Sequence, residues 1–203
     1  MPWWPLVTAA VCVAALVTFA SPGLQHALTL DRDALWTGEW WRLFTGHLVH
    51  FTPRHLIYDL AVVLVAGLLA ETHSPRETRR LYLLSGPGIS IILIAAEPQM
   101  QVYGGLSGVA TGLAVFACLS RIETRGAIRW LARGTLLLIA LKLGWELTAG
   151  ASLFFAREDR AFVPVPMSHL AGAVIATGVF VAARLRGTIR PPDEDRHAAG
   201  PAP

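Results

Sequence analysis

Charged residues are scarce in this chain. They make up 15% of its 203 residues, against about a quarter in an average soluble domain. Hydrophobic residues make up 54% and gather in long uncharged runs, which predicts an integral membrane protein. Because the arginines stand in the connections between these runs, the net charge of +3 gives no reason to expect a nucleic-acid partner.

Cysteine is also rare, and no metal motif is present. Cys12 and Cys118 each lie inside an apolar run, which predicts small buried side chains in preference to a disulfide or a metal site. The histidines and carboxylates before residue 54 lack the spacing of a zinc motif such as H-E-x-x-H (His26, Asp31, Asp33, Glu39, His47, His50). We therefore expect neither a metal nor another cofactor.

Six apolar runs are candidates for membrane helices. The first is 18 residues long and spans about 27 Å as a helix, close to the thickness of a bilayer core. All six are expected to be helices, because a span must satisfy its backbone hydrogen bonds internally. No internal repeat is evident, which argues against an inverted-repeat transporter. The runs are Trp3–Ala20, His55–Ala70, Leu81–Ala96, Leu106–Ser120, Leu131–Ala149 and Pro166–Arg184.

The placement of arginine predicts the orientation. Eleven arginines fall on the side that holds both termini: residues 76, 79, 80, 121, 125, 129, 133, 184, 186, 190 and 196. Five fall on the other side, at positions 32, 42, 54, 157 and 160. The positive-inside rule therefore places both termini in the cytoplasm. The proline-rich, charged tail 187–203 is expected to be disordered, which leaves residues 1–186 as the membrane domain.

The connection 21–54 then faces outward. Trp36, Trp40 and Trp41 lie close together in it, and tryptophan favours the membrane–water boundary. We expect a structured loop with short helices that lie partly in the outer leaflet.

Ser107 is the candidate nucleophile. It stands in Gly105-Leu-Ser-Gly108, where a glycine-rich stretch turns into an apolar run, so no bulky neighbour shields its hydroxyl. A helix from Leu106 to Ser120 spans about 22 Å, less than a bilayer core. Ser107 should therefore lie below the outer membrane surface, and residues 97–104 should line a hydrated cavity, since irregular backbone at that depth needs cover by protein or water.

His169 is the candidate general base. It follows Pro166 closely, so it also lies near the outer end of its helix. Gly108 and Gly112 on one helix, and Gly172 and Ala176 on the other, form small-x-x-x-small faces that let two helix backbones approach closely. Such an approach would let a neutral imidazole activate Ser107. Taken alone, His169 would more readily be a structural hydrogen-bonding residue.

These motifs resemble those of the rhomboid intramembrane serine proteases over residues 1–186. Rhomboids carry G-x-S-G at the start of the fourth helix and A/S-H-x-x-G at the start of the sixth, matched by Gly105–Gly108 and by Ser168–Gly172. A Trp-Arg pair in the first loop is matched by Trp41-Arg42. The resemblance implies an all-α bundle of six transmembrane helices with a membrane-embedded outer loop between helices 1 and 2. Within the family, the loop sequence Gly38–His50 and the sequence Lys142–Glu146 in the fifth predicted span look most like the rhombosortase branch.

One position departs from the family pattern. Rhomboids carry H-x-x-x-N at the start of the second helix, whereas this chain reads His55-Leu-Ile-Tyr-Asp59. The resemblance implies that this histidine, this amide and the serine backbone N–H hold the oxyanion, with Gly105 and Leu106 supporting the loop. An ionised Asp59 cannot donate a hydrogen bond. Either it is protonated by its apolar surroundings, or it orients His55, which we favour.

Lys142 and Glu146 stand four residues apart in an otherwise apolar span. Ionisable groups in such a place are paired or functional. The first interpretation is a structural ion pair. The second is recognition of a polar group of the substrate, with Trp145 between them as a further candidate.

The predicted function is an intramembrane serine endopeptidase with a Ser107–His169 dyad, in a bacterial inner membrane, with its site open to the outer face. The resemblance implies a single-span membrane protein as substrate, with a C-terminal Gly-Gly-type sorting anchor. The main alternative is a rhomboid-like protein that binds membrane segments without cutting them; a transporter is the weakest. The partners expected are the substrate and the lipid bilayer, with no nucleic acid.

Overall fold

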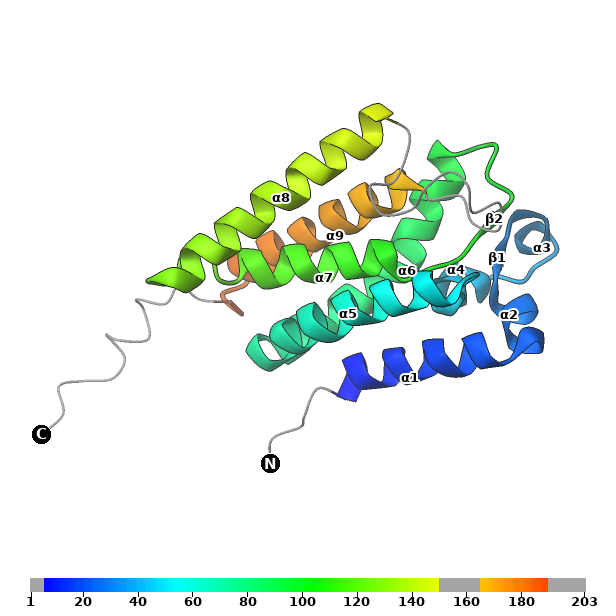
Figure 1. The fold of residues 1–203 in the computed structure, drawn as a ribbon, viewed down its shortest axis with the longest axis horizontal. Helices are drawn as coiled ribbons and strands as arrows, with labels where there is room; N and C mark the ends of the chain where they lie inside the picture. The colour runs from blue at the N-terminus through cyan, green and yellow to red at the C-terminus, as the bar shows by residue number, and fades with distance from the viewer. Residues whose placement is uncertain (1–5, 150–164, 190–203) are drawn as a thin grey trace, which may run out of the picture.

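The computed structural model describes residues 6–149 and 165–189. Residues 190–203 of the predicted tail lie outside this range. The helices are α1 (Leu6–Ala20), α2 (Pro22–Leu28), α3 (Arg32–Trp36), α4 (Arg42–Thr45), the short 3₁₀ helix η1 (Gly46–Leu48), α5 (Pro53–His73), α6 (Pro75–Ala96), α7 (Ser107–Leu119), α8 (Ala127–Ala149) and α9 (Pro166–Leu185). Two short strands, β1 (Leu30–Asp31) and β2 (Val102–Tyr103), pair antiparallel (Figure 1).

Each of the six predicted spans falls on a helix, so the all-α class is confirmed. By length and apolar composition, α5, α6 and α9 can each cross a membrane. The bent pair α1–α2 makes a fourth span if its two helices are counted as one. The helix α7 is shorter, as predicted. The number of spans therefore stays a prediction, while the multi-pass membrane character is supported.

Proline sets the start of several helices. Pro53, Pro75 and Pro166 each occupy the first turn, where a fixed φ and a missing N–H are no disadvantage. For this reason α6 begins at Pro75, ahead of the predicted Leu81, and the arginines placed in a loop lie in its first turns. The hydroxyl of Thr52 accepts a hydrogen bond from the backbone N–H of His55 at 3.2 Å and so caps α5.

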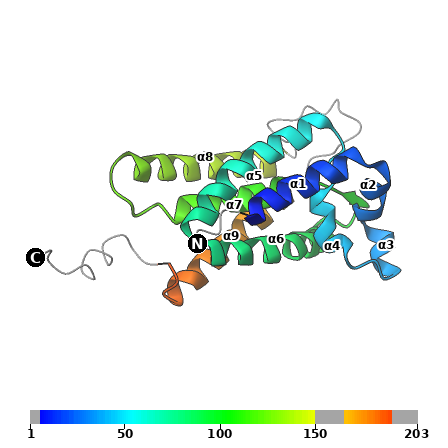
Figure 2. The same cartoon turned by 90° about the horizontal axis from the view of Figure 1, so that it is seen from below.

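The helix α7 lies at the centre of the bundle, where it packs against α5, α6, α8 and α9. Its Leu113 and Phe116 are fully buried. The start of α1 and the end of α9 lie at one end of the bundle, and the sheet with α2, α3 and α4 lies at the other (Figures 1 and 2). The predicted cysteine burial is partly wrong, because Cys12 and Cys118 are half-buried free thiols.

The segment 21–54 is structured, as expected. Arg42 is buried and donates hydrogen bonds to the carbonyl oxygens of His26 at 2.9 Å and Thr29 at 2.6 Å, and to the Glu39 carboxylate at 2.7 Å. These charge-assisted bonds fold the segment back on itself. Trp36, Trp40 and Trp41 are exposed on its surface. Their exposure suits the predicted contact with the outer leaflet, which stays a prediction.

The segment 21–54 also contacts the connection between α6 and α7 and fixes its position. Arg32 donates side-chain hydrogen bonds, each of 3.0 Å, to the carbonyl oxygens of Ile94, Glu97 and Met100. The register of β1 with β2 pairs Leu30 with Tyr103. These contacts satisfy backbone groups of an irregular segment and fix where α7 begins.

The backbones of α7 and α9 are in direct contact through glycine. A methyl group built on Gly108 would stand 2.7 Å from the carbonyl oxygen of Ser168, and one built on Gly172 would overlap the carbonyl oxygen of Gly108. One on Gly112 would stand 2.9 Å from the Gly172 carbonyl oxygen. The predicted small faces of the two helices therefore lie against each other.

Gly172→Ala is expected to lower the free energy of unfolding in detergent by about 1–3 kcal/mol, because the added methyl must push the two helices apart. The matched control is Gly178→Ala on the same helix, where a methyl group meets nothing within 4 Å. That change should leave stability equal or raise it by up to about 1 kcal/mol through helix propensity. Equal effects of the two changes, measured by denaturant titration, would contradict the close contact.

Candidate active site

Ser107 is the first residue of α7 and is half-buried. Gly105, two residues before it, has a φ of +132°, a conformation that side chains rarely adopt. A methyl group on Gly105 would also stand 2.6 Å from Cε1 of His55. The G-x-S-G glycine is therefore required by both backbone shape and the close packing of the His55 ring.

The N-terminus of α7 has backbone N–H groups that no side chain caps. Leu106 is the N-cap residue and makes no side-chain cap, so the first backbone N–H groups of the helix have no intrahelical acceptor. The helix dipole places partial positive charge at the same point. A developing oxyanion beside Ser107 would be stabilised by both effects.

His169 lies in the first turn of α9, one residue from the Ser168 carbonyl that contacts Gly108. Its side chain is 10% exposed, and its Nδ1 lies 2.8 Å from Oε2 of Glu146 and 3.1 Å from Nζ of Lys142. Within the described residues, no hydrogen bond joins the side chains of Ser107 and His169 directly. The fold places them on the first turns of adjoining helices, where the Ser107 side chain contacts Tyr103.

Tyr103 occupies the space beside Ser107. Its phenol is buried and donates to the carbonyl oxygen of Gly105 at 3.2 Å. Burial raises the pKa of Tyr103, while side-chain contacts with Ser168 and Ser107 oppose that rise. The phenol is thus a neutral donor at physiological pH. It ties the loop before Ser107 to the start of α9.

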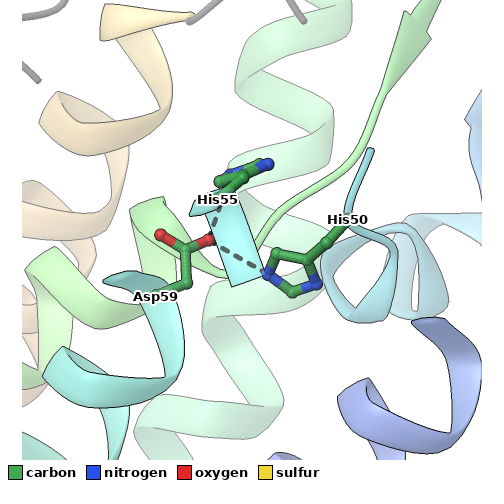
Figure 3. Close-up of side chains that lie close together, drawn as sticks. All are labelled: His50, His55 and Asp59. Atoms are coloured by element: carbon green, nitrogen blue, oxygen red, sulfur yellow. Dashed lines mark hydrogen bonds and ion pairs between the residues drawn. The ribbon is translucent and has the colours of Figure 1, made fainter. Parts of the chain in front are cut away.

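His50, His55 and Asp59 form a buried cluster beside Gly105 (Figure 3). Oδ2 of Asp59 lies 3.1 Å from Nε2 of His50 and 3.2 Å from Nε2 of His55. The i, i+4 spacing places His55 and Asp59 on one face of α5, while His50 comes from the end of the outer segment. The backbone N–H of Leu106 also approaches Nε2 of His50, at 3.4 Å.

His50 joins three polar groups of the cluster. Its Nδ1 lies 3.2 Å from the carbonyl oxygen of Leu48, which can only accept a hydrogen bond. Its Nε2 faces both the Asp59 carboxylate and the backbone N–H of Leu106. These contacts stabilise the buried carboxylate. An uncompensated carboxylate at this depth would be far more costly.

The three ligand atoms of this cluster lie within 4.8 Å of one another and could hold a metal ion. The contacts of Asp59 at 3.1 and 3.2 Å are hydrogen-bond distances. At these distances Asp59 forms a hydrogen bond with His50 and an ion-pair contact with His55.

Lys142 and Glu146 form an ion pair of 2.8 Å on α8, and both contact His169. Glu146 is fully buried, and Lys142 is half-buried. Trp145 is exposed on another face of α8, so it does not share their surroundings. The ion pair therefore belongs to the surroundings of the histidine, which neither sequence interpretation included.

A cavity of about 630 Å³ opens beside these groups. Part of the predicted stretch 97–104 lines it, together with Glu146 from α8 and Pro166 and Met167 from the start of α9. The location agrees with the expectation of a cavity lined by this stretch, while its hydration stays a prediction.

The apolar helical bundle defines a multi-pass membrane protein. The Rhomboid domain model matches residues 37–186, and the chain belongs to the rhomboid family. A curated relative, "Putative rhomboid protease YdcA" of Bacillus subtilis (strain 168), is 30% identical over 120 residues, which are 54% of this chain and 59% of the relative. The match thus spans less than two thirds of that relative's length. Members of the family are serine proteases.

Sequence reasoning missed three features of the site. The spacing of His50 in the outer loop gives no sign that it pairs with Asp59. Tyr103 lies in the stretch 97–104, and the sequence pattern predicts no role for its phenol. The contact of Glu146 with His169 joins residues 23 positions apart on different helices, and the unusual charges in an apolar span were the one signal for it.

Asp59→Leu is expected to lower the free energy of unfolding by about 3–5 kcal/mol, because two buried imidazoles lose their common acceptor. Asp59→Asn keeps a carbonyl oxygen for one of them and should cost clearly less. Denaturant titration of the two variants in the same detergent tests this. Equal losses would mean that the hydrogen bonds to Asp59 contribute nothing.

Proposed function

We propose that this protein is an intramembrane serine endopeptidase, with Ser107 as nucleophile and His169 as general base. The observation that carries the proposal is the backbone contact between Gly108 and Gly172. This contact joins the first turn of α7, which carries Ser107, to the N-terminal half of α9, which carries His169, and so supports a reaction that uses both side chains. Membership of the rhomboid family agrees with this chemistry.

The reaction follows from these positions. Ser107 Oγ attacks the scissile carbonyl carbon while its proton passes to Nε2 of His169. The C–O bond forms, and the carbonyl oxygen becomes an oxyanion held by backbone N–H groups at the start of α7. Collapse breaks the C–N bond, and the leaving amine takes the proton from Nε2. Water then hydrolyses the ester by the same route.

Asp59 need not oppose the oxyanion. Its Oδ2 contacts both His50 and His55, and the His55 ring lies closer to Gly105 than Asp59 does. We infer that His55 supplies the side-chain donor of the oxyanion site, oriented by Asp59. The glycines at 105, 108, 112 and 172 allow the close packing around Ser107 and between α7 and α9. Leu106 is the N-cap residue of α7.

We further propose that the substrate is a single-span membrane protein. A helical segment must unwind before a carbonyl reaches Ser107, and glycine lowers the cost of unwinding by about 1 kcal/mol per residue relative to alanine. The resemblance to rhombosortases favours a C-terminal Gly-Gly-type sorting anchor. We place the site at the outer face of a bacterial inner membrane, because arginine is enriched on the side of the termini.

Purified protein should react with a fluorophosphonate at Ser107. The Oγ–P bond forms, the P–F bond breaks, fluoride leaves, and the proton passes to His169. Ser107→Ala and His169→Ala should each lower labelling at least about 10³-fold. Ser120→Ala is the matched control, since this serine lies past the far end of α7 and donates to the Phe116 carbonyl oxygen.

A folded wild-type protein that stays unlabelled in several detergents and in lipid would contradict the protease. It would favour the second candidate, a rhomboid-like protein that binds membrane segments without cutting them. The observation on the side of that candidate is Asp59, which stands where a donor amide is expected.

Co-expression with a single-span reporter tests the substrate class. A reporter with Gly-Gly at the outer end of its span should be cleaved about 20–30 times faster than its Ala-Ala counterpart, which is about 2 kcal/mol of unwinding. Cleavage should vanish with Ser107→Ala. Equal cleavage of the two reporters would show that unwinding at this point is not what selects the substrate.

A further inference from the structure

The helix α8 brings a buried carboxylate to the candidate base. Oε2 of Glu146 lies 2.8 Å from Nδ1 of His169 and 2.8 Å from Nζ of Lys142. The Glu146 side chain is 0% exposed, and that of Lys142 is 24% exposed. A carboxylate that has left water entirely needs full compensation by hydrogen bonds and charge. Here Oε2 receives both, while Oε1 is buried without a hydrogen-bond partner among the described residues.

The distances decide the tautomer of His169. An ammonium group is a donor without an acceptor, and an ionised carboxylate is an acceptor without a donor. Glu146 therefore holds a proton on Nδ1, which leaves the Nε2 lone pair for the proton of Ser107. If Lys142 instead donated to Nδ1 across its 3.1 Å, Nε2 would carry the hydrogen and His169 would be useless as a base. The Glu146 contact is the shorter of the two.

We propose that Glu146 is a positioning residue of the active site, the third member of a Ser107–His169–Glu146 relay, with Lys142 as its counter-charge. The inference rests on the proposed protease function and deepens it. Glu146 keeps His169 in the productive tautomer and stabilises the imidazolium that forms when the proton of Ser107 arrives at Nε2. Glu146 itself remains ionised throughout.

Lys142 has the opposite influence on that imidazolium. Its ammonium lies close to the ring and disfavours a second positive charge. The proposed relay thus requires that His169 accept the proton of Ser107 between a carboxylate and an ammonium group. Removal of Glu146 should therefore make His169 harder to protonate, and removal of Lys142 should make it easier. A purely structural ion pair would not move the pH dependence in two opposite directions.

The other polar groups near the first turns of α7 and α9, among the described residues, are Ser107 on α7, Ser168 on α9 and Tyr103 on β2. The Tyr103 phenol contacts both serines. Glu97, at the end of α6, lines the same cavity as Glu146, and Ile89 is the α6 side chain that approaches Gly108. Among the groups described, Lys142 and Glu146 are the two in direct contact with the ring.

The test measures the rate of fluorophosphonate labelling at Ser107 from pH 5 to 9. Glu146→Gln should lower the plateau rate by about 10²–10⁴-fold, because the amide can hold the wrong tautomer. The acid limb of its profile, where the labelling rate falls as the pH is lowered, should move to lower pH.

Glu146→Asp should label at least about tenfold faster than Glu146→Gln. Lys142→Met should move the acid limb to higher pH. Glu123→Gln is the matched control, since Glu123 pairs with Arg184 of α9 at 2.8 Å near the other end of that helix.

Two outcomes separate the failures. If wild type labels at Ser107 while Glu146→Gln labels at the same rate and with the same pH profile, the relay is wrong and the protease stands. If folded wild type does not label at all, the protease is wrong and the relay fails with it. Should Glu146→Gln not fold, the acid limb of Lys142→Met decides, because an unmoved or lowered limb overturns the proposal.

Discussion

The backbone contact between α7 and α9 is the constraint on which the rest of the structure depends. At Gly108 and Gly172 the two helices meet with no side chain between them. An alanine at either position would increase the distance between the helix backbones. Gly108 is the second residue of α7 and Gly172 is the seventh of α9, so the contact constrains the relative position of Ser107 and His169. Dispersion between closely packed backbones, and not apolar burial from water, must hold such a pair in lipid. The chemistry and the packing therefore share the same few residues.

Around this contact, buried charge is arranged in compensated groups. Asp59 lies between two imidazoles, and Glu146 lies between an ammonium and an imidazole. Asp59 comes from α5 and Glu146 from α8, and each contacts a histidine of another element. The cost of burying each charge is offset locally, and the same contacts orient the histidines. We regard this dual role as the reason why charged residues appear in otherwise apolar helices.

The sequence was sufficient to predict the helices and the meeting of their outer ends. Apolar runs located the six long helices, and the glycine spacing predicted which faces of α7 and α9 would pack. It was insufficient for contacts that depend on side-chain direction. The pairing of His50 with Asp59 and of Glu146 with His169 each joins two elements whose relative rotation no local pattern specifies. The sheet of β1 and β2 was missed because two residues per strand give no readable alternation.

The decisive measurement is an experimental structure of the protein after reaction with a fluorophosphonate. Phosphorus should be bonded to Ser107 Oγ, with Nε2 of His169 within about 3.2 Å of the adduct. Nδ1 of His169 should contact Glu146, and the phosphonyl oxygen should lie at the backbone N–H groups that begin α7. An adduct on another residue, or a His169 ring turned away from a modified Ser107, would contradict a Ser107–His169 protease site.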